Sequence, residues 1–276
     1  MTVVVVTDAS SRLPADVREQ WAIREVALHV LLDGLDLRDG VDAIPDDVYK
    51  RHATTAGATP AELRAAYLEA LADSGGDGVV AVHISSALSG TYRAAELTAA
   101  ELGPAVRVVD SRSAAMGTGF VALAAARAAA AGADLETVAG AADAAVPRTH
   151  AFMVVHRLDN LRRSGRIGGA KAWLGTALAL KPLLRVDDGN LVLAQRIRTA
   201  RGAITAMVDQ VCEVVGERAA ALAVHHVANP DGADTVVTAL AERLPTCAPA
   251  LVTPLGPVLA VHVGYGAVAV CLQFDE

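Results

Sequence analysis

Hydroxyl side chains are concentrated in one short segment of the chain. The segment Ser85-Ser86-Ala87-Leu88-Ser89-Gly90-Thr91 follows a predicted strand, Val79–Ile84, and leads into a predicted helix. Free backbone N–H groups and the positive end of the helix dipole gather where a helix begins, and hydroxyls add further donors. The segment therefore predicts a site for a carboxylate or a phosphate. The alternative is structural: Ser89 caps the helix and the other hydroxyls satisfy turn backbone.

Two further segments carry polar side chains that could reach the same ligand. Thr54 and Thr55 precede a helix that we predict at Pro60–Ala72. His262 lies in Pro257–Gly266, a run that we predict as a strand ending in glycines. An imidazole at that place could donate a hydrogen bond to an anion. A lone histidine is more often a structural residue, so both roles stay open for His262.

Enzyme motifs are scarce in the sequence. Gly117–Ala122 and Gly264–Ala269 match G-x-G-x-x-A, but neither follows a strand in a tight turn that opens a helix, so we assign both to turns and close packing. The chain has no G-x-x-x-x-G-K-[ST], H-E-x-x-H or G-x-S-x-G. A triad of Ser86, Asp110 and His262 would make the protein an independent serine hydrolase-like enzyme, acting on a small anionic or ester substrate. This enzyme is the alternative hypothesis.

Positive charge is concentrated in one part of an acidic chain. The net charge is −7, yet the segment between Arg157 and Arg201 holds ten cations and only three acids. This asymmetry predicts a docking surface for an acidic partner or a phosphate-bearing ligand, and the alternative is a set of solvated faces. Aromatic residues make up only 3% of the chain, so we expect no nucleic-acid partner.

The elements that would position these residues follow an α/β order in the first half. Apolar residues make up 53% of the 276 residues, which is typical of a packed globular protein. Strands and helices alternate, which predicts a Rossmann-like parallel sheet with helices on both faces in an N-terminal domain, residues 1–147. The predicted strands are Val3–Thr7, Gly78–Ile84 and Ala105–Val109, and the predicted helices between and after them are Leu13–Trp21, Pro60–Ala72, Ser89–Leu102 and Ser113–Ala131.

A second α/β domain is predicted for residues 148–276. Its strands are predicted at Ala151–Val155, Leu180–Val186, Leu191–Ala194, Ala219–His225, Ala250–Thr253 and Ala267–Phe274, and its helices at Arg198–Val215 and Asp231–Leu244. The turn Asp187-Asp188-Gly189-Asn190 should join two of these strands as a hairpin. Ligands usually bind in the cleft between two domains, so we place the site there.

The number and spacing of the cysteines and the hydropathy of the chain indicate the cellular compartment. Cys212, Cys247 and Cys271 are widely separated and form no C-x-x-C, so we expect neither a disulfide framework nor a thiolate metal site. We see no signal peptide and no transmembrane span in the sequence. The expected location is the cytoplasm.

The residues that carry a family resemblance follow one another in order along nearly the whole chain. They are Thr7-Asp8 with Leu13-Pro14, the Ser85–Tyr92 segment, Val109-Asp110-Ser111 with Gly117, Leu161 with Gly165-Arg166-Ile167, Lys181-Pro182-Leu183-Leu184 with Asp188-Gly189 and Arg198-Thr199, and His262 with Gly264 and Gly266. In these motifs the chain resembles the DegV family of bacterial fatty-acid-binding proteins, which includes the lipid-binding subunit of fatty acid kinase.

The resemblance implies a function in lipid metabolism. The protein would hold a single long-chain fatty acid in an apolar tunnel, and a separate ATP-dependent kinase subunit would phosphorylate its carboxylate to an acyl phosphate. The carboxylate would lie on Thr55, Ser86, Ser89, Gly90, Thr91 and His262. Arg166, Lys181, Arg198 and Arg201 would engage the kinase or the phosphate. The protein would be no enzyme by itself and would need no cofactor or metal of its own, because ATP and Mg would belong to the kinase. Membrane contact would be transient at most.

The sequence departs from the family pattern at several positions. Thr55-Ala56-Gly57-Ala58 stands where members commonly have Thr-Ser-Gln-Pro, which removes a hydroxyl and an amide from the expected head-group side. Arg12 replaces an Asp, and Tyr265 replaces a Pro. Ser164 and Ala115 replace a Gly and a Ser. These changes leave the preferred acyl chain open.

Overall fold

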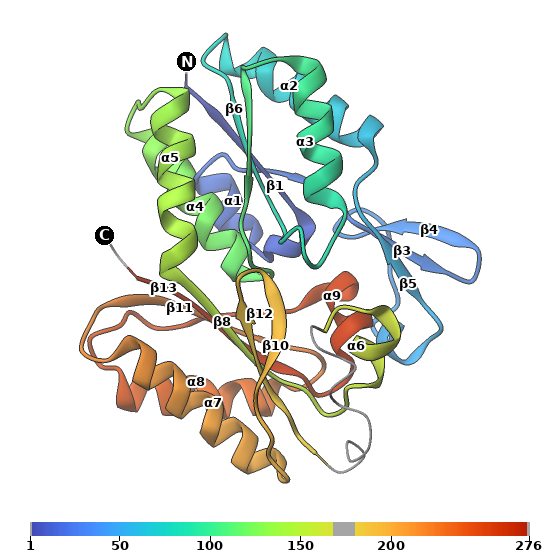
Figure 1. Cartoon of the computed structure of the whole chain (residues 1–276), viewed down its shortest axis with the longest axis vertical. Coiled ribbons are helices and arrows are strands. Elements are labelled where there is room, and N and C mark those ends of the chain that lie inside the picture. Colours follow the sequence, from blue (N-terminus) through green and yellow to red (C-terminus); the bar gives the residue numbers. More distant parts are fainter. Residues whose placement is uncertain (1, 168–179, 275–276) are drawn as a thin grey trace.

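The computed structural model describes residues 2–167 and 180–274 (Figure 1). Lys171, one cation of the predicted basic segment, lies outside these ranges. The described residues form three sheets, of four, six and three strands. In Figure 1 the four-stranded sheet and its helices fill the upper half of the molecule, and the six-stranded sheet fills the lower half.

The four-stranded sheet is parallel throughout, with strand order β2-β1-β6-β7. Its strands are β1 (Val4–Asp8), β2 (Arg24–Val26), β6 (Val79–His83) and β7 (Val106–Asp110). Parallel strands place their carboxyl ends at the same edge, so Asp8, the serine segment and Asp110 meet there. The predicted parallel sheet is confirmed: β1 and β7 are shifted by one residue, β6 is one residue shorter at each end, and the short β2 is added.

Helices cover both faces of this sheet, as predicted. Val5, Val80 and Val82 pack in one cluster with α4 (Met116–Ala130) and α5 (Leu135–Ala145). Val6, Val79 and Ala81 alternate with these residues along the strands, and they pack in a second cluster with two other helices. Those helices are α2 (Pro60–Ser74) and α3 (Thr91–Leu102). Side chains alternate across a strand, so each strand serves both layers. Thr59 caps α2 with a capping box to Glu62.

The six-stranded sheet is mixed, with order β10-β9-β8-β13-β11-β12 and a single parallel pair, β11 with β12. Its strands are β8 (Thr149–Val154), β9 (Leu183–Asp187), β10 (Asn190–Gln195), β11 (Ala220–His226), β12 (Leu251–Pro254) and β13 (Val268–Phe274). One face packs on α7 (Ala200–Val215) and α8 (Pro230–Arg243). The β9–β10 turn has φ of +47° at Asp188 and +77° at Gly189, which suits a two-residue hairpin and confirms that prediction.

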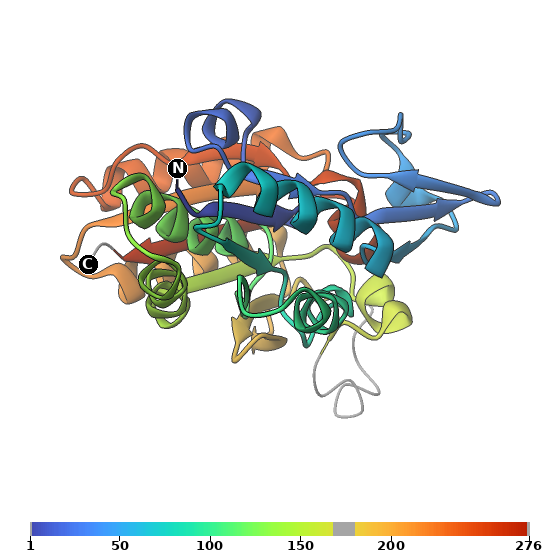
Figure 2. The ribbon, with the colours of Figure 1, turned by 90° about the horizontal axis from the view of Figure 1, so that it is seen from above.

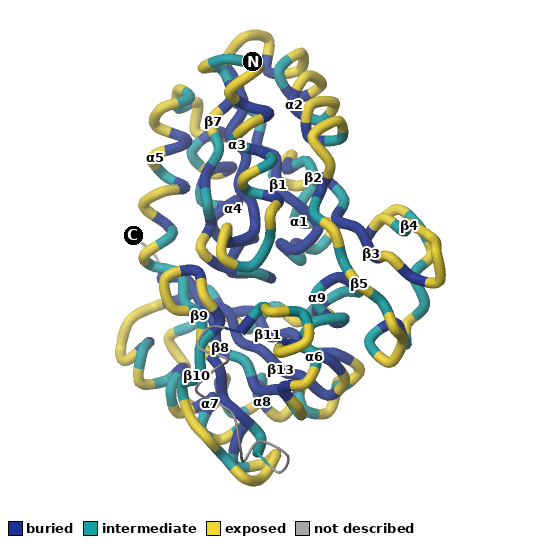
Figure 3. Tube along the Cα trace, turned by 45° about the vertical axis from the view of Figure 1, so that its right-hand side comes forward, coloured by how far each residue is buried: buried dark blue, intermediate teal, exposed yellow. Residues whose placement is uncertain are grey.

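Helix α4 lies between the two large sheets and joins their cores. It contacts β1 and β6 on one side and β8 and β13 on the other. Figure 3 shows it dark blue along most of its length, as expected for a helix that packs all round. A methyl group added at Gly119 would lie 2.9 Å from the Ser11 carbonyl oxygen and 2.8 Å from Met116 Sδ. The first G-x-G motif therefore serves close packing.

A small antiparallel sheet, β4-β3-β5, was missed by the sequence analysis. Its strands are β3 (His29–Leu32), β4 (Leu35–Arg38) and β5 (Thr54–Ala56), and they project to one side in Figures 1 and 2. Each has only three or four residues, too few for a clear alternating pattern. Its role is to carry Thr55 toward the middle of the molecule.

The prediction of a strand around His262 is wrong, because this run forms helix α9 (Gly256–Val263). A short apolar run does not distinguish a buried strand from a buried helix. Pro257, at the beginning of the run, was the overlooked signal, because proline fits the first turn of a helix. The glycines that follow have φ of +77° at Gly264 and +79° at Gly266 and end the helix in a turn.

The remaining helical segments in residues 2–167 and 180–274 are short. They are α1 (Ala15–Gln20), α6 (Asp159–Ser164), η1 (Ala9–Ser11), η2 (Val48–Lys50) and η3 (Val146–Arg148). The chain passes from the first large sheet to the second through α5 and η3. The predicted boundary between the two domains, at residues 147 and 148, falls in η3. The two large sheets share one apolar cluster, to which β1, α4 and β13 all contribute.

Candidate ligand-binding site

A partly open cavity lies where the two large sheets and the small sheet approach one another. The centre of a water-sized sphere can occupy about 120 Å³ of it. Most of its wall is apolar and comes from both halves of the chain: Leu28, Ala56, Ile84, Leu88, Ala114, Ala115, Ala151, Phe152, Met153, Leu161, Val186, Leu191, Leu255, Val258, Leu259, Val263, Ala269 and Cys271. Burial raises the pKa of Cys271 to about 12, so its thiol stays neutral and belongs to this apolar wall.

Four polar side chains interrupt the apolar wall: Thr55, Ser89, Arg166 and His262. Thr55 on β5 and His262 on α9 form a hydrogen bond of 2.7 Å between Oγ1 and Nε2. Thr55 is held in place by pairing with Val30 of the neighbouring strand. Thus two segments 207 residues apart, both selected from the sequence, meet at the cavity.

The imidazole of His262 is neutral near pH 7. Burial lowers its pKa to about 4, and the nearby positive charge of Arg166 acts in the same direction. Among the described residues, buried Nδ1 has no hydrogen-bond partner. When Nε2–H donates to Thr55, the threonine proton is free for a ligand, and when Thr55 donates to Nε2, Nδ1–H is free. Either tautomer leaves one donor available.

The serine segment contributes Ser89 and Gly90 to the cavity. Ser89 Oγ accepts from the Thr91 backbone N–H at 3.2 Å and lies 2.9 Å from Thr91 Oγ1. Thr91 is buried and does not line the cavity. A methyl group added at Gly57 would lie 2.6 Å from Thr91 Oγ1. The glycine in the altered Ala56-Gly57-Ala58 stretch therefore lets β5 lie against the beginning of α3.

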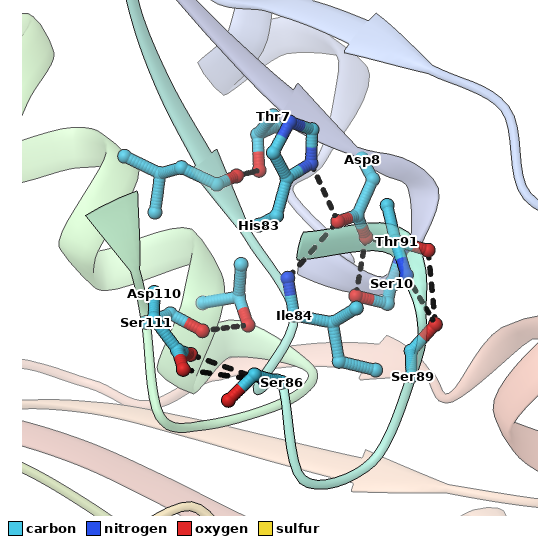
Figure 4. A network of polar contacts seen from close by, with 12 residues as sticks. Thr7, Asp8, Ser10, His83, Ile84, Ser86, Ser89, Thr91, Asp110 and Ser111 are labelled. Carbon is cyan, nitrogen blue, oxygen red and sulfur yellow. Dashed lines mark hydrogen bonds and ion pairs between the residues drawn. The ribbon is translucent and has the colours of Figure 1, made fainter. Parts of the chain in front are cut away.

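A buried polar network holds the beginning of the serine segment (Figure 4). Asp8 accepts from the Ile84 backbone N–H at 3.0 Å and from Ser10 Oγ at 2.5 Å, and His83 Nδ1 lies 3.0 Å from it. Tyr67 OH closes the network at 2.7 Å from His83 Nε2. Burial by itself would raise the pKa of Asp8, but the contacts with His83 and Ser10 hold it below its ordinary value.

Ser86 lies apart from the cavity. It is exposed, and its backbone N–H lies 3.3 Å from both carboxylate oxygens of Asp110 (Figure 4). Ser85 is buried and donates from Oγ to the Gly189 carbonyl at 2.8 Å. In the described ranges no hydrogen bond joins Ser86 to His262, whose Nε2 is bonded to Thr55. The structure therefore does not bring the hypothetical triad together, and part of the serine segment does satisfy backbone groups.

The four cations that the sequence grouped have different surroundings in the structure. Arg166 lines the cavity, and donates from Nε to the Leu88 carbonyl at 3.2 Å and from Nη1 to the Ser164 carbonyl at 2.6 Å. Lys181 donates to the His156 carbonyl at 3.3 Å. Arg198 and Arg201 lie exposed at the beginning of α7, with no side-chain partner among residues 2–167 and 180–274.

The sequence analysis missed the network beneath the serine segment and the place of Arg166 in the wall. Asp8 directly follows one predicted strand and His83 is the second-last residue of another, and polar residues at those places could have indicated the network. Arg166 gave no such signal, because its position depends on how α6 packs on α9. In the parts of the chain that the structure describes, three or more His, Cys, Asp or Glu side chains nowhere gather as a metal site would require. None of the helices described there is long and apolar enough to cross a membrane.

The comparison with known proteins shows the class to which this fold and cavity belong. The family model described as "Uncharacterised protein, DegV family" matches residues 2–275. The chain belongs to the DegV family.

Relatives and solved structures agree with this assignment. The chain is 77% identical over 273 residues to a DegV domain-containing protein of Mycobacterium tuberculosis, covering 99% of this chain and 98% of that protein. A fatty-acid-binding DegV family protein from Thermus thermophilus superposes with a TM-score of 0.92 at 32% identity, covering 100% of both chains. DegV of Bacillus subtilis, described as a fatty acid binding protein, superposes with a TM-score of 0.89 at 28% identity, again over 100% of both chains.

Proposed function

We propose that this protein binds one long-chain fatty acid in the cavity, with the carboxylate at Thr55, Ser89 and His262. The observation that carries the proposal is the Thr55–His262 pair in a wall that is otherwise mostly apolar. The solved relatives from Thermus thermophilus and Bacillus subtilis, whose folds match over the whole chain, are described as fatty acid binding. The mostly apolar cavity described above suits the same ligand class here.

The head-group end would hold a carboxylate by hydrogen bonds from neutral groups. The Thr55–His262 pair supplies one donor and Ser89 supplies another, and hydrogen bonds to a charged acceptor are stronger than neutral ones. Arg166 adds a positive charge in the same wall. Its Nε and Nη1 are engaged by the carbonyls of Leu88 and Ser164, so it stabilises the anion mainly through its charge.

The tail end would supply most of the affinity. Leu, Val, Ala, Met and Phe side chains offer no hydrogen bonds that would select a polar chain. Each methylene that leaves water for such a wall contributes about 0.8 kcal/mol. The β9–β10 hairpin contributes Val186 and Leu191 to this apolar wall, and α6 contributes Leu161.

Substitution of the head-group pair tests the binding proposal. Thr55→Val and His262→Asn keep the approximate size of each side chain, and each should weaken oleate binding about tenfold by removing a hydrogen bond to a charged group. Displacement of a fluorescent fatty acid measures the affinity, and circular dichroism checks the fold. Unchanged oleate affinity in both folded variants would refute this placement of the carboxylate.

We infer further that the bound fatty acid is presented to a separate ATP-dependent kinase subunit. A carboxylate oxygen would attack the γ-phosphorus of ATP, the bond to the β-phosphate oxygen would break, and ADP would leave an acyl phosphate behind. In this step the nucleophile would be the carboxylate of the fatty acid, so no side chain of this protein would act as one. ATP and Mg²⁺ would come with the kinase. Exposed Arg198 and Arg201 support a docking surface for an acidic partner.

The kinase step has its own test. The double variant Arg198→Glu/Arg201→Glu should bind oleate as the wild type does, but yield less acyl phosphate with a fatty acid kinase catalytic subunit, ATP and Mg²⁺. Hydroxylamine traps the product as a hydroxamate, which mass spectrometry quantifies. The double variant Arg64→Glu/Arg107→Glu, which reverses two exposed cations on α2 and β7 outside the basic segment, is the matched control. Equal hydroxamate yields for both variants would show that α7 does not dock the kinase.

A further inference from the structure

Arg12 connects segments from the two ends of the chain. Its Nη1 lies 3.5 Å from Asp39 Oδ1, and its Nε donates to the Pro254 carbonyl at 3.3 Å. Nη1 also lies 3.4 Å from the Ala9 carbonyl. Asp39 follows β4, whereas Pro254 ends β12 directly before α9. The guanidinium therefore joins the small sheet and the first large sheet to the segment that leads into the helix of His262.

Asp39 extends this contact into the first turn of α9. Only 5% of its side chain is exposed, and its carboxylate accepts a hydrogen bond from the Val258 backbone N–H. A carboxylate near the first turn of a helix also interacts favourably with the helix dipole. Arg12 and Asp39 thus hold the beginning of α9 from two directions.

The backbone at this junction is adapted to the guanidinium. Arg12 has φ of +53°, a left-handed conformation that is unfavourable for a residue with a Cβ atom. Gly256 has φ of +74°, and a methyl group there would lie 2.4 to 2.9 Å from three atoms of the Arg12 guanidinium. The side chain fits only because Gly256 leaves this space. Strained backbone of this kind persists where surrounding contacts require it.

The beginning of α9 is only one helical turn from the head-group pair. Val258 and His262 are four residues apart, so they lie on the same face of the helix, and both line the cavity. A helix of eight residues has little length in which to absorb a shift at its first turn. The geometry points to Arg12 as a positioning residue, which holds α9 so that His262 meets Thr55. Its effect on ligand affinity rests on the function proposed above.

Arg12→Asn tests this role, because asparagine tolerates the left-handed backbone but lacks the guanidinium. NMR titration of the His262 imidazole in the ligand-free protein should show a higher pKa than in the wild type, since a displaced α9 hydrates the ring. Arg166, not Arg12, is the charge that acts on His262, so loss of the Arg12 charge does not itself explain such a rise. Oleate affinity should fall about tenfold.

Three further variants make the result decisive. Arg112→Asn is the matched control: Arg112 also has left-handed backbone, with φ of +47°, but its ion pair is with Asp188, away from α9. It should leave the His262 titration unchanged. Arg12→Gly also lacks the guanidinium and fits the left-handed backbone, so it should reproduce the effect of Arg12→Asn, and it keeps the test open if Arg12→Asn does not fold. Arg12→Lys should restore part of the wild-type titration.

The outcomes separate this inference from the proposed function. An unchanged His262 titration in both Arg12→Asn and Arg12→Gly would overturn the positioning role, even if the melting temperature falls. If wild-type protein does not bind oleate, the proposed function fails, whereas the titration in ligand-free protein still decides the role of Arg12.

Discussion

At the scale of single residues, the site divides into side chains that face the cavity and side chains that build its frame. Thr55, Ser89 and His262 face the cavity, whereas Thr91 is buried beside it. The sequence selected all four because hydroxyls and a histidine lie near predicted turns. It could not rank them, because the direction of each side chain depends on packing between segments far apart in the chain.

The serine segment provides a prediction at this scale. Ser89→Ala should weaken oleate binding about tenfold, because it removes a donor from the cavity, whereas Ser86→Ala should change the affinity less. Isothermal titration calorimetry with oleate measures both variants. A larger loss for Ser86→Ala than for Ser89→Ala would mean that the segment turns when the ligand binds.

At the scale of elements, the small sheet is held to the first large layer by a histidine between two carboxylates. His29 Nδ1 lies 2.7 Å from Asp36 Oδ1, and His29 Nε2 lies 3.0 Å from Glu62 Oε2. These three residues come from β3, β4 and α2, and His29 pairs with Ala56, next to Thr55. Burial would lower the pKa of His29, but its hydrogen bonds to the two carboxylates raise it.

This contact predicts a pH dependence of stability. Because the pKa of His29 is higher in the folded protein, its contribution is complete below the unfolded pKa, about 6.5, and is lost as the pH rises through the folded pKa. His29→Gln should therefore destabilise the protein by about 1–3 kcal/mol at pH 6 and by less at pH 8.5. Urea unfolding at both pH values measures the difference. A destabilisation that is equal or larger at pH 8.5 would show that His29 is neutral in the folded protein.

The elements also show how far the sequence alone could lead. Long periodic helices and runs of valine predicted α2, α3, α4 and the strands β1, β6 and β7 to within a few residues. The small sheet escaped because its strands are short, and α9 was assigned as a strand because an apolar run fits either structure when buried. Both errors fall on the elements that carry Thr55 and His262, so their meeting could not be derived from local patterns.

At the scale of the whole molecule, the cavity exists because three sheets converge on it. Helix α4 fills the space between the two large sheets with small side chains, and its glycines permit that approach. The β9–β10 hairpin reaches across to the serine segment, where Gly189 accepts from Ser85 and Asp188 pairs with Arg112 at 2.5 Å. An apolar ligand placed there would be enclosed by both halves of the chain.

Native mass spectrometry of the purified protein, followed by organic extraction and lipid analysis, tests the central claim most directly. We expect one fatty acid per chain, because the described residues hold one Thr55–His262 pair in the mostly apolar wall of this cavity. Protein that carries no fatty acid, and that takes up none when oleate or palmitate is added, would contradict the account.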